Sequence, residues 1–427
     1  MKRTQKIFAV SSMDIFWKQL IYWSKQFQEV VFLDSNDHNL KYHSVTKILA
    51  CDAMTSIQTD DFEQFEEFVS HLKDWCFGFV SYDAQISTEQ FPNEKTDVLQ
   101  FPDIAFFQPK RLIEILDNQQ VKFSYLACCD DEIDNDFQNI QLVEITDFSH
   151  DKISLQAKVS QEEYIKNFNK AKQYIHRGDS YELNYCIEFF AENAIIHPEY
   201  FFCKLNEKAK SSFASFVKWR DKFALCASPE RYVKKIGTKV ISQPIKGTAK
   251  RGKTEEEDKN NIKYLQTNPK EQSENLMIVD LVRNDLSKIA EKDTVKVEEL
   301  CGIYSFPTVH QMISTVVCEI PQQATLLDVF QASFPMGSMT GAPKQRTMEI
   351  IAELEAHKRG LYSGTIGYIS PNGDADFNVV IRSLLYNQSN KYVSLSVGSA
   401  VTFVANAHDE YTECLLKAQS IRELLEN

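Results

Sequence analysis

Near its carboxyl end the chain contains extended segments joined by turns of only a few residues, and this pattern constrains the fold more than any other. Residues 364–369 and 377–386 are rich in apolar and β-branched residues, and Pro371-Asn372-Gly373-Asp374 lies between them. The turn Asn387–Asn390 leads into a further segment at 392–403. Such turns join antiparallel neighbours, because a parallel pair needs a crossover of about a dozen or more residues. The sequence therefore predicts an α+β fold with large antiparallel-rich sheets and helices packed outside them.

The acidic composition excludes several classes of function. The formal net charge is −13. Nucleic acids and anionic membrane surfaces are bound by basic faces, so we expect neither as a partner. The chain has no signal-peptide core and no run of about 18 apolar residues, which predicts a cytoplasmic protein. Its cysteines are scattered without CxxC pairs, as is typical of reduced thiols in the cytosol.

The two parts of the chain, residues 1–150 and 151–427, differ in how much their patterns reveal. The first part is rich in Phe, Asp and Gln and contains no recognisable catalytic constellation. The acidic run Asp130–Asp136 predicts a solvated loop near the boundary. Helical spacing resumes over Glu162–Ile175. We therefore expect an amino-terminal region up to residue 150 and a catalytic region after it.

Two pairs of glutamates lie three residues apart at the start of predicted helices. Glu271 and Glu274 share a helix face with the apolar residues that follow them, and Glu410 and Glu413 do the same in the last helix. Carboxylates that face inward repel one another unless a cation lies among them, and Mg²⁺ with its oxygen ligands fits such a site. The alternative is that these glutamates only complement the helix dipoles.

Lys246 lies between Pro-Ile and Gly-Thr in the segment Gln243–Thr248, where the flanking bends can fix the direction of its side chain. A lysine acts as a nucleophile only when its amine is neutral. Burial, or the nearby cations Lys250 and Arg251, would lower its pKa toward that state. The alternative is an exposed lysine in a loop.

Three further features are candidate binding or proton-transfer groups. Arg382 lies on a predicted strand and shares a face with apolar residues, so it needs either a carboxylate of the protein or a bidentate carboxylate of a substrate. Gly337–Lys344 precedes a predicted helix, whose free amides can bind an anion. His310 is either a proton carrier or a buried core histidine.

Taken together, these segments resemble the chorismate-utilising enzymes, which comprise anthranilate synthase component I, aminodeoxychorismate synthase component I, and the isochorismate and salicylate synthases. The resemblance covers roughly residues 160–427 and implies an anthranilate synthase component I-like fold. It implies that residues 1–150 form the family's divergent amino-terminal region, interleaved with the main fold, and that 151–427 bind chorismate. The matching motifs, in order, are Ser228–Arg231, Pro244–Thr248, Glu271–Leu286, His310, Gly337–Lys344, Gly367-Tyr368, Ile381-Arg382 and Glu410–Glu413.

The resemblance also implies roles for the site residues. Glu274 and Glu413 would bind Mg²⁺, and Glu271 and Glu410 would assist through water. Gly398-Ser399-Ala400 stands where the family has a loop of two or three glycines, whose amides approach the ring carboxylate. The residues that would bind chorismate are Arg382 and Tyr368 at the enolpyruvyl carboxylate, with Ser338, Thr340, Gly341 and Gly398 around them.

Lys246 decides which reaction the resemblance implies. Enzymes that make anthranilate, isochorismate or salicylate typically have alanine there, whereas lysine is similar to aminodeoxychorismate synthase component I. The isochorismate type also has a water-activating lysine where this chain has Tyr181–Asn184, with no lysine. The implied reaction is amination of chorismate at C4 to 4-amino-4-deoxychorismate, in para-aminobenzoate and folate biosynthesis. Lys246 would attack ring C2, Glu230 would protonate the leaving hydroxyl, and His310 would be a further catalytic residue.

Ammonia would come from a separate glutamine amidotransferase subunit, because no cysteine lies in the Gly-x-Cys-x-Gly setting of a glutaminase nucleophile. Anthranilate synthase component I remains the nearest alternative. Isochorismate or salicylate synthesis, or a chorismate-binding subunit without catalysis, are the others.

Overall fold

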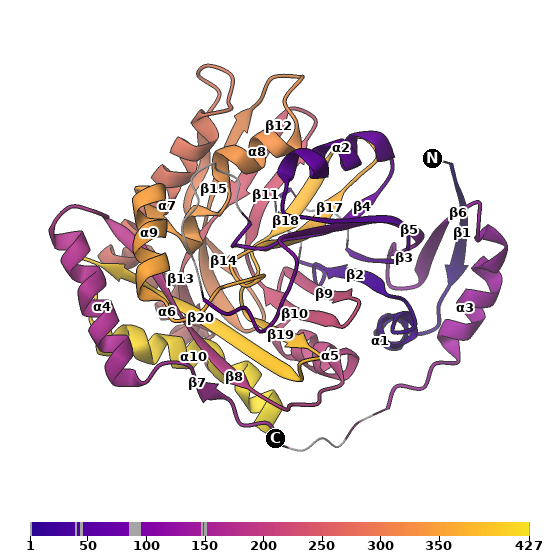
Figure 1. The fold of residues 1–427 in the computed structure, drawn as a ribbon, viewed down its shortest axis with the longest axis horizontal. Helices are drawn as coiled ribbons and strands as arrows, with labels where there is room; N and C mark the ends of the chain where they lie inside the picture. The colour runs from indigo at the N-terminus through magenta and orange to yellow at the C-terminus, as the bar shows by residue number, and fades with distance from the viewer. Residues whose placement is uncertain are drawn as a thin grey trace.

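A computed structural model describes residues 2–38, 41–42, 46–84, 95–146, 148 and 152–426. The expected boundary at residues 150 and 151 lies outside the described residues, so the division into two regions stays a prediction. Within the described part, sheets occupy the middle of the molecule and helices cover their outer faces (Figure 1). The predicted α+β, antiparallel-rich class is confirmed, because every strand pairing between the described strands is antiparallel.

The first sheet combines strands from both halves of the chain. Its spatial order is β1 (Arg3–Ala9), β6 (Gln120–Leu126), β5 (Ile104–Ile115), β3 (Lys47–Thr59), β2 (Glu29–Asp34), β9 (Phe213–Trp219), β10 (Lys222–Ser228), β19 (Ser383–Asn387), β20 (Tyr392–Thr402) and β8 (Glu182–Ala191). The short strands β7 (Gln156–Ala157) and β16 (Gly341–Ala342) also pair with β8.

The second sheet begins where β4 pairs with the long strand β5, which therefore belongs to both sheets. Its order is β4 (Cys76–Val80), β17 (Thr365–Ile369), β18 (Ala375–Asn378), β11 (Arg231–Ile236), β12 (Lys239–Gln243) and β15 (Val309–Glu319). Both β13 (Ile245–Lys250) and β14 (Lys296–Ser305) pair with β15. Pairing of β2 with β9 and of β4 with β17 joins early and late strands in the same sheets.

Helices enclose the sheets and create two apolar cores. One core lies between the first sheet and its outer helices, and the other contains residues of both sheets together with α7 and α8. The helices are α1 (Met13–Ser24), α2 (Phe62–Leu72), α3 (Ile133–Gln141), α4 (Gln161–His176), α5 (Pro198–Ala209), α6 (Glu255–Thr267), α7 (Pro269–Ser287), α8 (Leu326–Ser333), α9 (Lys344–Leu354) and α10 (Ala407–Glu426), with 3₁₀ turns at Asp130–Glu132 and Gly337–Met339.

The side chains of strand β20 point alternately to the apolar core and to the cavity. Val393, Leu395 and Val397 belong to the core under the outer helices. Side chains alternate along a strand, so Ser396 and Gly398 are directed to the opposite face, where the cavity described below lies.

The acidic run Asp130–Asp136 is not the solvated loop that the sequence predicts. It forms a 3₁₀ turn and the start of α3, because Ile133 is fully buried and anchors the segment. The carboxylate of Asp136 accepts hydrogen bonds from Arg111 Nε at 3.1 Å and from the hydroxyl of Tyr125 at 3.0 Å. The run is therefore helical rather than a loop, although Asp131, Glu132, Asp134 and Asn135 are exposed, as its charge predicts.

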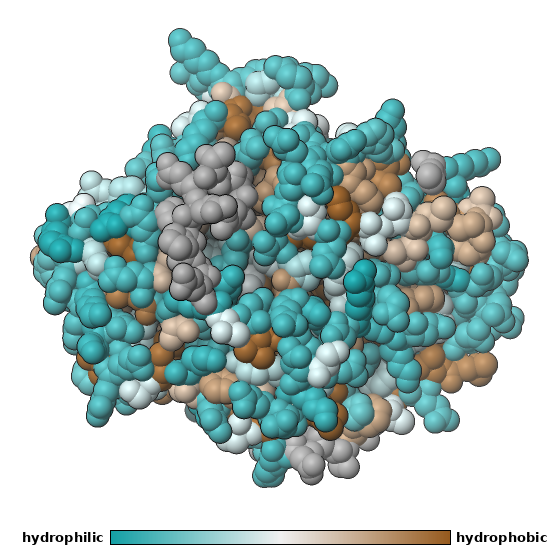
Figure 2. Space-filling view, in the orientation of Figure 1, coloured by the Kyte–Doolittle hydropathy of each residue, from teal (hydrophilic) through white to brown (hydrophobic). Residues whose placement is uncertain are grey.

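The surface agrees with the acidic, polar composition. On the face shown in Figure 2, hydrophilic residues predominate and apolar side chains are scattered in small groups. Among the described helices none has both the length and the apolar character needed to span a membrane. All ten cysteines are free thiols.

Candidate functional site

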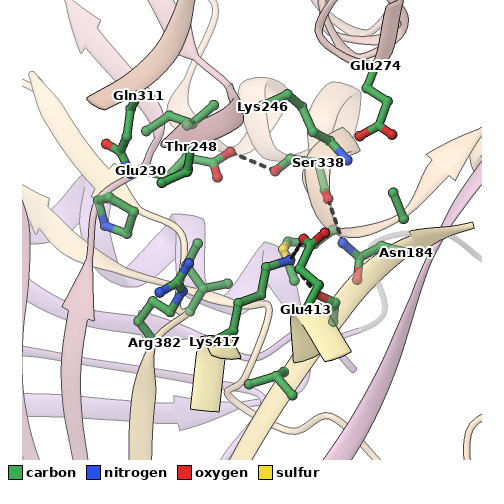
Figure 3. Close-up of a pocket in the computed structure, with 18 of the residues that line it drawn as sticks. Asn184, Glu230, Lys246, Thr248, Glu274, Gln311, Ser338, Arg382, Glu413 and Lys417 are labelled. Carbon is green, nitrogen blue, oxygen red and sulfur yellow. Dashed lines mark hydrogen bonds and ion pairs between the residues drawn. The ribbon is translucent and has the colours of Figure 1, made fainter. Parts of the chain in front are cut away.

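A cavity of about 410 Å³ lies where the first turns of α7 and α10 approach β13 and β20. Figure 3 shows Glu230, Lys246, Ser338 and Glu274 in the upper part of the view, with Arg382, Lys417 and Glu413 below them. The structure thus brings together residues that are far apart in the sequence. The predicted residues that line the cavity are Glu230, Lys246, Glu271, Glu274, Ser338, Arg382, Gly398, Glu410 and Glu413.

Caps at two helix starts direct the glutamate pairs inward. The side chain of Asn268 accepts hydrogen bonds from the backbone amides of Lys270 and Glu271, at 2.9 and 3.3 Å, and Pro269 occupies the first position of α7. At α10 the side chain of Asn406 accepts from the amide of His408 at 2.9 Å. Glu271 and Glu410 lie in the first turns that these caps begin, and Glu274 and Glu413 follow one turn later, as their spacing predicts.

The four carboxylates are incompletely neutralised. Lys270 Nζ lies 3.0 Å from Glu410 Oε1 and 3.8 Å from Glu274 Oε1, and Lys417 Nζ lies 2.6 Å from Glu413 Oε1. Glu274 is 8% exposed, and burial raises its pKa to about 7. Within the described part of the chain, its Oε1 has no hydrogen-bond partner. Among the described residues, no three His, Cys, Asp or Glu side chains converge as a ready-made metal site.

The Lys246 side chain is 13% exposed and its surroundings raise its pKa, which corrects the expectation that they lower it. Burial acts in that direction, but the carboxylates of Glu182 and Glu274 outweigh it and hold the pKa of Lys246 above its ordinary value. Its ammonium donates a hydrogen bond to Glu182 Oε1 at 2.7 Å. Arg251, expected to lower this pKa, pairs instead with Asp258 at 2.8 Å.

Glu230 faces the same space from the turn between β10 and β11. It is 5% exposed and accepts a hydrogen bond from the hydroxyl of Ser338 at 2.7 Å. Burial raises the pKa of Glu230 to about 7, although Ser338 and the charge of Lys246 oppose this rise. A carboxyl group with such a pKa can donate a proton near neutral pH.

Arg382 lies between two strands rather than on the continuous strand that the sequence predicts. The chain crosses here from β18 in the second sheet to β19 in the first, and Arg382 has a positive φ of 53°. The crossing breaks the regular ladder: the amide of Val379 donates to Glu230 O at 3.0 Å, outside any strand. Among the described residues, the guanidinium of Arg382 has no protein carboxylate within ion-pair distance, which favours a ligand carboxylate as its partner.

Comparison with known proteins identifies the family. A family model described as chorismate binding enzyme matches residues 17–423. This chain belongs to the chorismate binding enzyme family. The match covers residues from both halves of the chain.

Two relatives and one solved structure agree with this assignment. The chain is 34% identical over 355 residues to the anthranilate synthase component I-like protein of Synechocystis sp., covering 82% of this chain and 72% of that one. It is 33% identical over 352 residues to aminodeoxychorismate synthase component 1 of Klebsiella aerogenes, covering 82% and 77%. Anthranilate synthase component I from Streptococcus pneumoniae matches with a TM-score of 0.79 and 25% identity, over 90% of this chain and 94% of that one. The expected anthranilate synthase component I-like fold is confirmed.

In this chorismate binding enzyme, Gly398 occupies a place where no side chain fits. A Cβ atom there would lie 2.1 Å from Asn184 Oδ1 and 2.8 Å from Cys186 Sγ. The neighbouring Ser399 directs its hydroxyl away from the cavity, 2.8 Å from the hydroxyl of Tyr164 on α4. These residues lie within β20 rather than in a loop, and the Ser399 side chain stays off the cavity face of that strand.

Four predicted residues do not line the cavity: His310, Tyr368, Thr340 and Gly341. His310 is fully buried, with Nδ1 2.8 Å from Ser305 Oγ and Nε2 2.9 Å from Asp258 Oδ1. Tyr368 is 8% exposed on β17 and packs its ring 5.4 Å from that of Trp75. The structure therefore places His310 and Tyr368 in supporting positions, and their predicted roles in catalysis and binding stay predictions.

Thr340 and Gly341 lie behind Ser338 rather than in the cavity wall. The carbonyl of Thr340 accepts from the amide of Asn184 at 2.8 Å, and Gly341 pairs with Leu183 of β8. Both residues thereby hold the loop that carries Ser338 against β8.

Several residues of the site escaped the sequence analysis. Lys417 follows Glu413 by four residues, and Lys270 precedes Glu274 by four, so helical spacing could have indicated both pairs. Nothing in the sequence indicated that Glu182 lies beside Lys246. The further cavity residues that were missed are Asn184, Tyr362, Gln311 and Ser396.

Proposed function

We propose that this chorismate binding enzyme aminates chorismate at C4 to give 4-amino-4-deoxychorismate, as the aminating component of para-aminobenzoate synthesis. The observation that carries the proposal is the position of Lys246, whose amine lies inside the cavity on the same side as the carboxyl of Glu230 (Figure 3). The name of the Klebsiella aerogenes relative supports the same reaction.

The cavity suits a small dicarboxylate such as chorismate. Its volume of about 410 Å³ is within the usual range for small-molecule sites. The guanidinium of Arg382 would hold the enolpyruvyl carboxylate through paired hydrogen bonds. Gly398 and the Asn184 side chain packed closely against it both line the cavity, where they would face the ring carboxylate.

Replacement of the C4 hydroxyl with retained configuration requires two successive displacements. The amine of Lys246 would form a bond to ring C2 while the double bonds shift and the C4–O bond breaks. The carboxyl of Glu230 would protonate the departing hydroxyl, which leaves as water. Ammonia would then bond to C4, and the C2–N bond would break to return the amine of Lys246.

The glutamate pairs fit the proposed Mg²⁺. Glu274 and Glu413 would bind it directly, and Glu271 and Glu410 through water. They offer only oxygen donors, which Mg²⁺ prefers. Glu274 Oε1 has no hydrogen-bond partner among the described residues, only the 3.8 Å ion pair with Lys270, so a cation could satisfy it. Burial also raises the pKa of Glu271 and Glu410, a sign of too little positive charge nearby. When bound, the ion would neutralise substrate carboxylate charge.

Ammonia would come from a separate glutamine amidotransferase subunit, and the reaction would take place in the cytoplasm. The chain offers no glutaminase nucleophile of the Gly-x-Cys-x-Gly type, and nine of its ten cysteines are buried or partly buried. Ammonium salts supplied in solution replace such a partner in an assay, so the chain can be tested by itself.

The test is the identity of the product. Wild-type protein with chorismate, Mg²⁺ and ammonium should yield 4-amino-4-deoxychorismate by liquid chromatography and mass spectrometry. Lys246→Ala should lower that rate by about 10⁴-fold or more, as removal of a covalent nucleophile does. Lys253→Ala, an exposed lysine in the connection to α6, is the matched control and should keep the wild-type rate.

Two outcomes would contradict the proposal. Undiminished 4-amino-4-deoxychorismate from Lys246→Ala would exclude the covalent role of Lys246. Anthranilate with pyruvate as the wild-type product would instead favour the anthranilate synthase component I reaction, which the name of the Synechocystis relative suggests.

A further inference from the structure

Glu182 is the carboxylate in direct contact with the proposed nucleophile. Its Oε1 accepts the hydrogen bond from Lys246 Nζ at 2.7 Å, although the two residues are 64 positions apart in the chain. Glu182 is 3% exposed, and its second oxygen, Oε2, is buried without a hydrogen-bond partner from any residue that the structure describes. It does not belong to the cavity wall, so it contacts Lys246 from behind.

We propose that Glu182 is the positioning residue of Lys246 and the base that takes its proton before the attack on chorismate. This inference rests on the proposed function, because it names the group that frees the nucleophile of that reaction. An ammonium has no lone pair, so the Lys246 side chain must lose a proton before it can form a bond to carbon. Glu182 is in hydrogen-bond contact with that proton.

The backbone around Glu182 is held on both sides. Glu182 pairs with Thr402 of β20 and with Ala342 of β16. The carbonyl of Glu182 accepts a hydrogen bond from the hydroxyl of Ser180 at 2.9 Å. Gly341 has a φ of 145°, and a Cβ atom there would lie 2.0 Å from that same carbonyl oxygen. Glycine at 341 therefore allows the close packing that fixes Glu182 beside Lys246.

Other carboxylates also act on the charge of Lys246, but the contacts and proposed roles of Glu230 and Glu274 differ from those of Glu182. Glu230 accepts from Ser338 and is assigned to the leaving hydroxyl. Glu274 is assigned to the cation, and no hydrogen bond joins it to Lys246 among the described residues. The carboxylates whose charges couple to Lys246 are Glu182 on β8, Glu230 before β11, Glu271 and Glu274 on α7, and Glu413 on α10.

The proton balance closes with these residues alone. Glu182 takes one proton from Lys246, whose lone pair then forms the bond to C2. Glu230 supplies the proton that leaves with the C4 hydroxyl as water. After ammonia has bonded to C4, the new ammonium returns a proton to Glu230. The released amine of Lys246 regains its proton from Glu182, so the site returns to its starting state.

The test uses Glu182→Gln, which keeps the size of the side chain and removes the base. The first measurement is acetylation of Lys246 by acetic anhydride across a pH series, quantified by mass spectrometry of its peptide. Loss of the adjacent negative charge should shift the labelling curve to lower pH by about 1–3 units. Glu298→Gln removes another glutamate paired with a lysine, Lys239 at 2.8 Å, and should leave the Lys246 curve unchanged.

The second measurement is turnover with chorismate, Mg²⁺ and ammonium. Glu182→Gln should lose about 10²-fold in kcat at neutral pH, and the loss should shrink as pH rises and solvent takes the proton. The variant therefore labels more readily yet reacts more slowly, a combination that simple misplacement of Lys246 does not produce. Glu182→Asp keeps a carboxylate and should recover part of the rate, which also covers the case that the glutamine variant folds poorly.

The outcomes separate this inference from the proposed function. Wild-type kcat with an unchanged pH profile in Glu182→Gln, or an unshifted labelling curve, overturns the role of Glu182 even if the protein aminates chorismate. A wild-type protein that makes no 4-amino-4-deoxychorismate overturns the proposed function instead, and the labelling curve still tests the coupling of Glu182 to Lys246.

Discussion

The two sides of the cavity are built from the same residue types, glutamate and lysine, but they satisfy their charges differently. On the side of Lys246, Glu182 accepts from the ammonium at 2.7 Å and Glu230 accepts from Ser338 at 2.7 Å. On the side of α7 and α10, Lys270 pairs with Glu410 and Lys417 with Glu413, while Glu274 Oε1 has no hydrogen-bond partner among the residues described.

This difference teaches which part of the site is complete before ligands bind. Paired, buried groups with fixed directions are preorganised, so they need little rearrangement when charge moves during a reaction. Ionised carboxylates whose pKa is raised by burial destabilise the folded protein until a cation binds among them. We therefore expect changes on the Lys246 side to act mainly on the rate, and changes on the other side to act on cation binding and stability.

The largest effect after loss of Lys246 itself is expected from Glu230→Gln. The amide cannot donate a carboxyl proton, so kcat should fall by about 10²–10⁴-fold. In the wild type the acid must be protonated, and its pKa is raised to about 7, so kcat/KM should fall as pH rises above neutrality. A pH series from acidic to alkaline buffers measures this. A wild-type profile that keeps rising past neutral pH would contradict the assignment of Glu230 as the acid.

A smaller effect is expected from Arg382→Met, which tests the proposed hydrogen bonds between Arg382 and the enolpyruvyl carboxylate of chorismate. Hydrogen bonds to a charged group are worth about 1.5–3 kcal/mol, so KM for chorismate should rise by about 10–100-fold. The change in kcat should be smaller, because the carboxylate is held equally before and during the reaction. Steady-state kinetics measure both. Arg382→Lys should recover only part, since lysine cannot form the paired contact, and an unchanged KM in Arg382→Met would exclude this contact.

What the sequence could predict depends on the distance over which its patterns act. Glu271 and Glu274 were found because helical spacing projects residues three and four apart onto one face, and caps then direct that face. Short turns likewise predicted the antiparallel pairs β17–β18 and β19–β20, although residues 377–386 were predicted as a single strand. Lys246 and Glu230 could be assigned roles only through family resemblance, because a single lysine in a turn is ambiguous.

Contacts between distant strands could not be read from local patterns. Glu182 and Lys246 lie on β8 and β13, which belong to different sheets and do not pair with each other. Arg382 looked like a strand residue because its neighbours are apolar, yet the chain changes sheets there. The strand is interrupted at Arg382 because β18 pairs with β11 and β19 pairs with β10. These pairings depend on the whole fold and not on the local sequence.

The smallest expected effect concerns the stability of the folded protein, and it comes from Glu274 on the side of α7 and α10. The folded-state pKa of Glu274 is raised to about 7 from an ordinary 4.5, so the folded protein holds a proton that the unfolded chain has lost between these values. Without Mg²⁺, stability should therefore fall as pH rises through this window, by about 1–3 kcal/mol. Glu274→Gln removes that loss, so at alkaline pH the metal-free variant should unfold at a higher temperature than wild type. Added Mg²⁺ should raise the unfolding temperature of wild type but much less that of the variant. Equal responses of the two proteins to Mg²⁺ would show that Glu274 does not hold the cation, and the two sides of the cavity would then differ only in their packing.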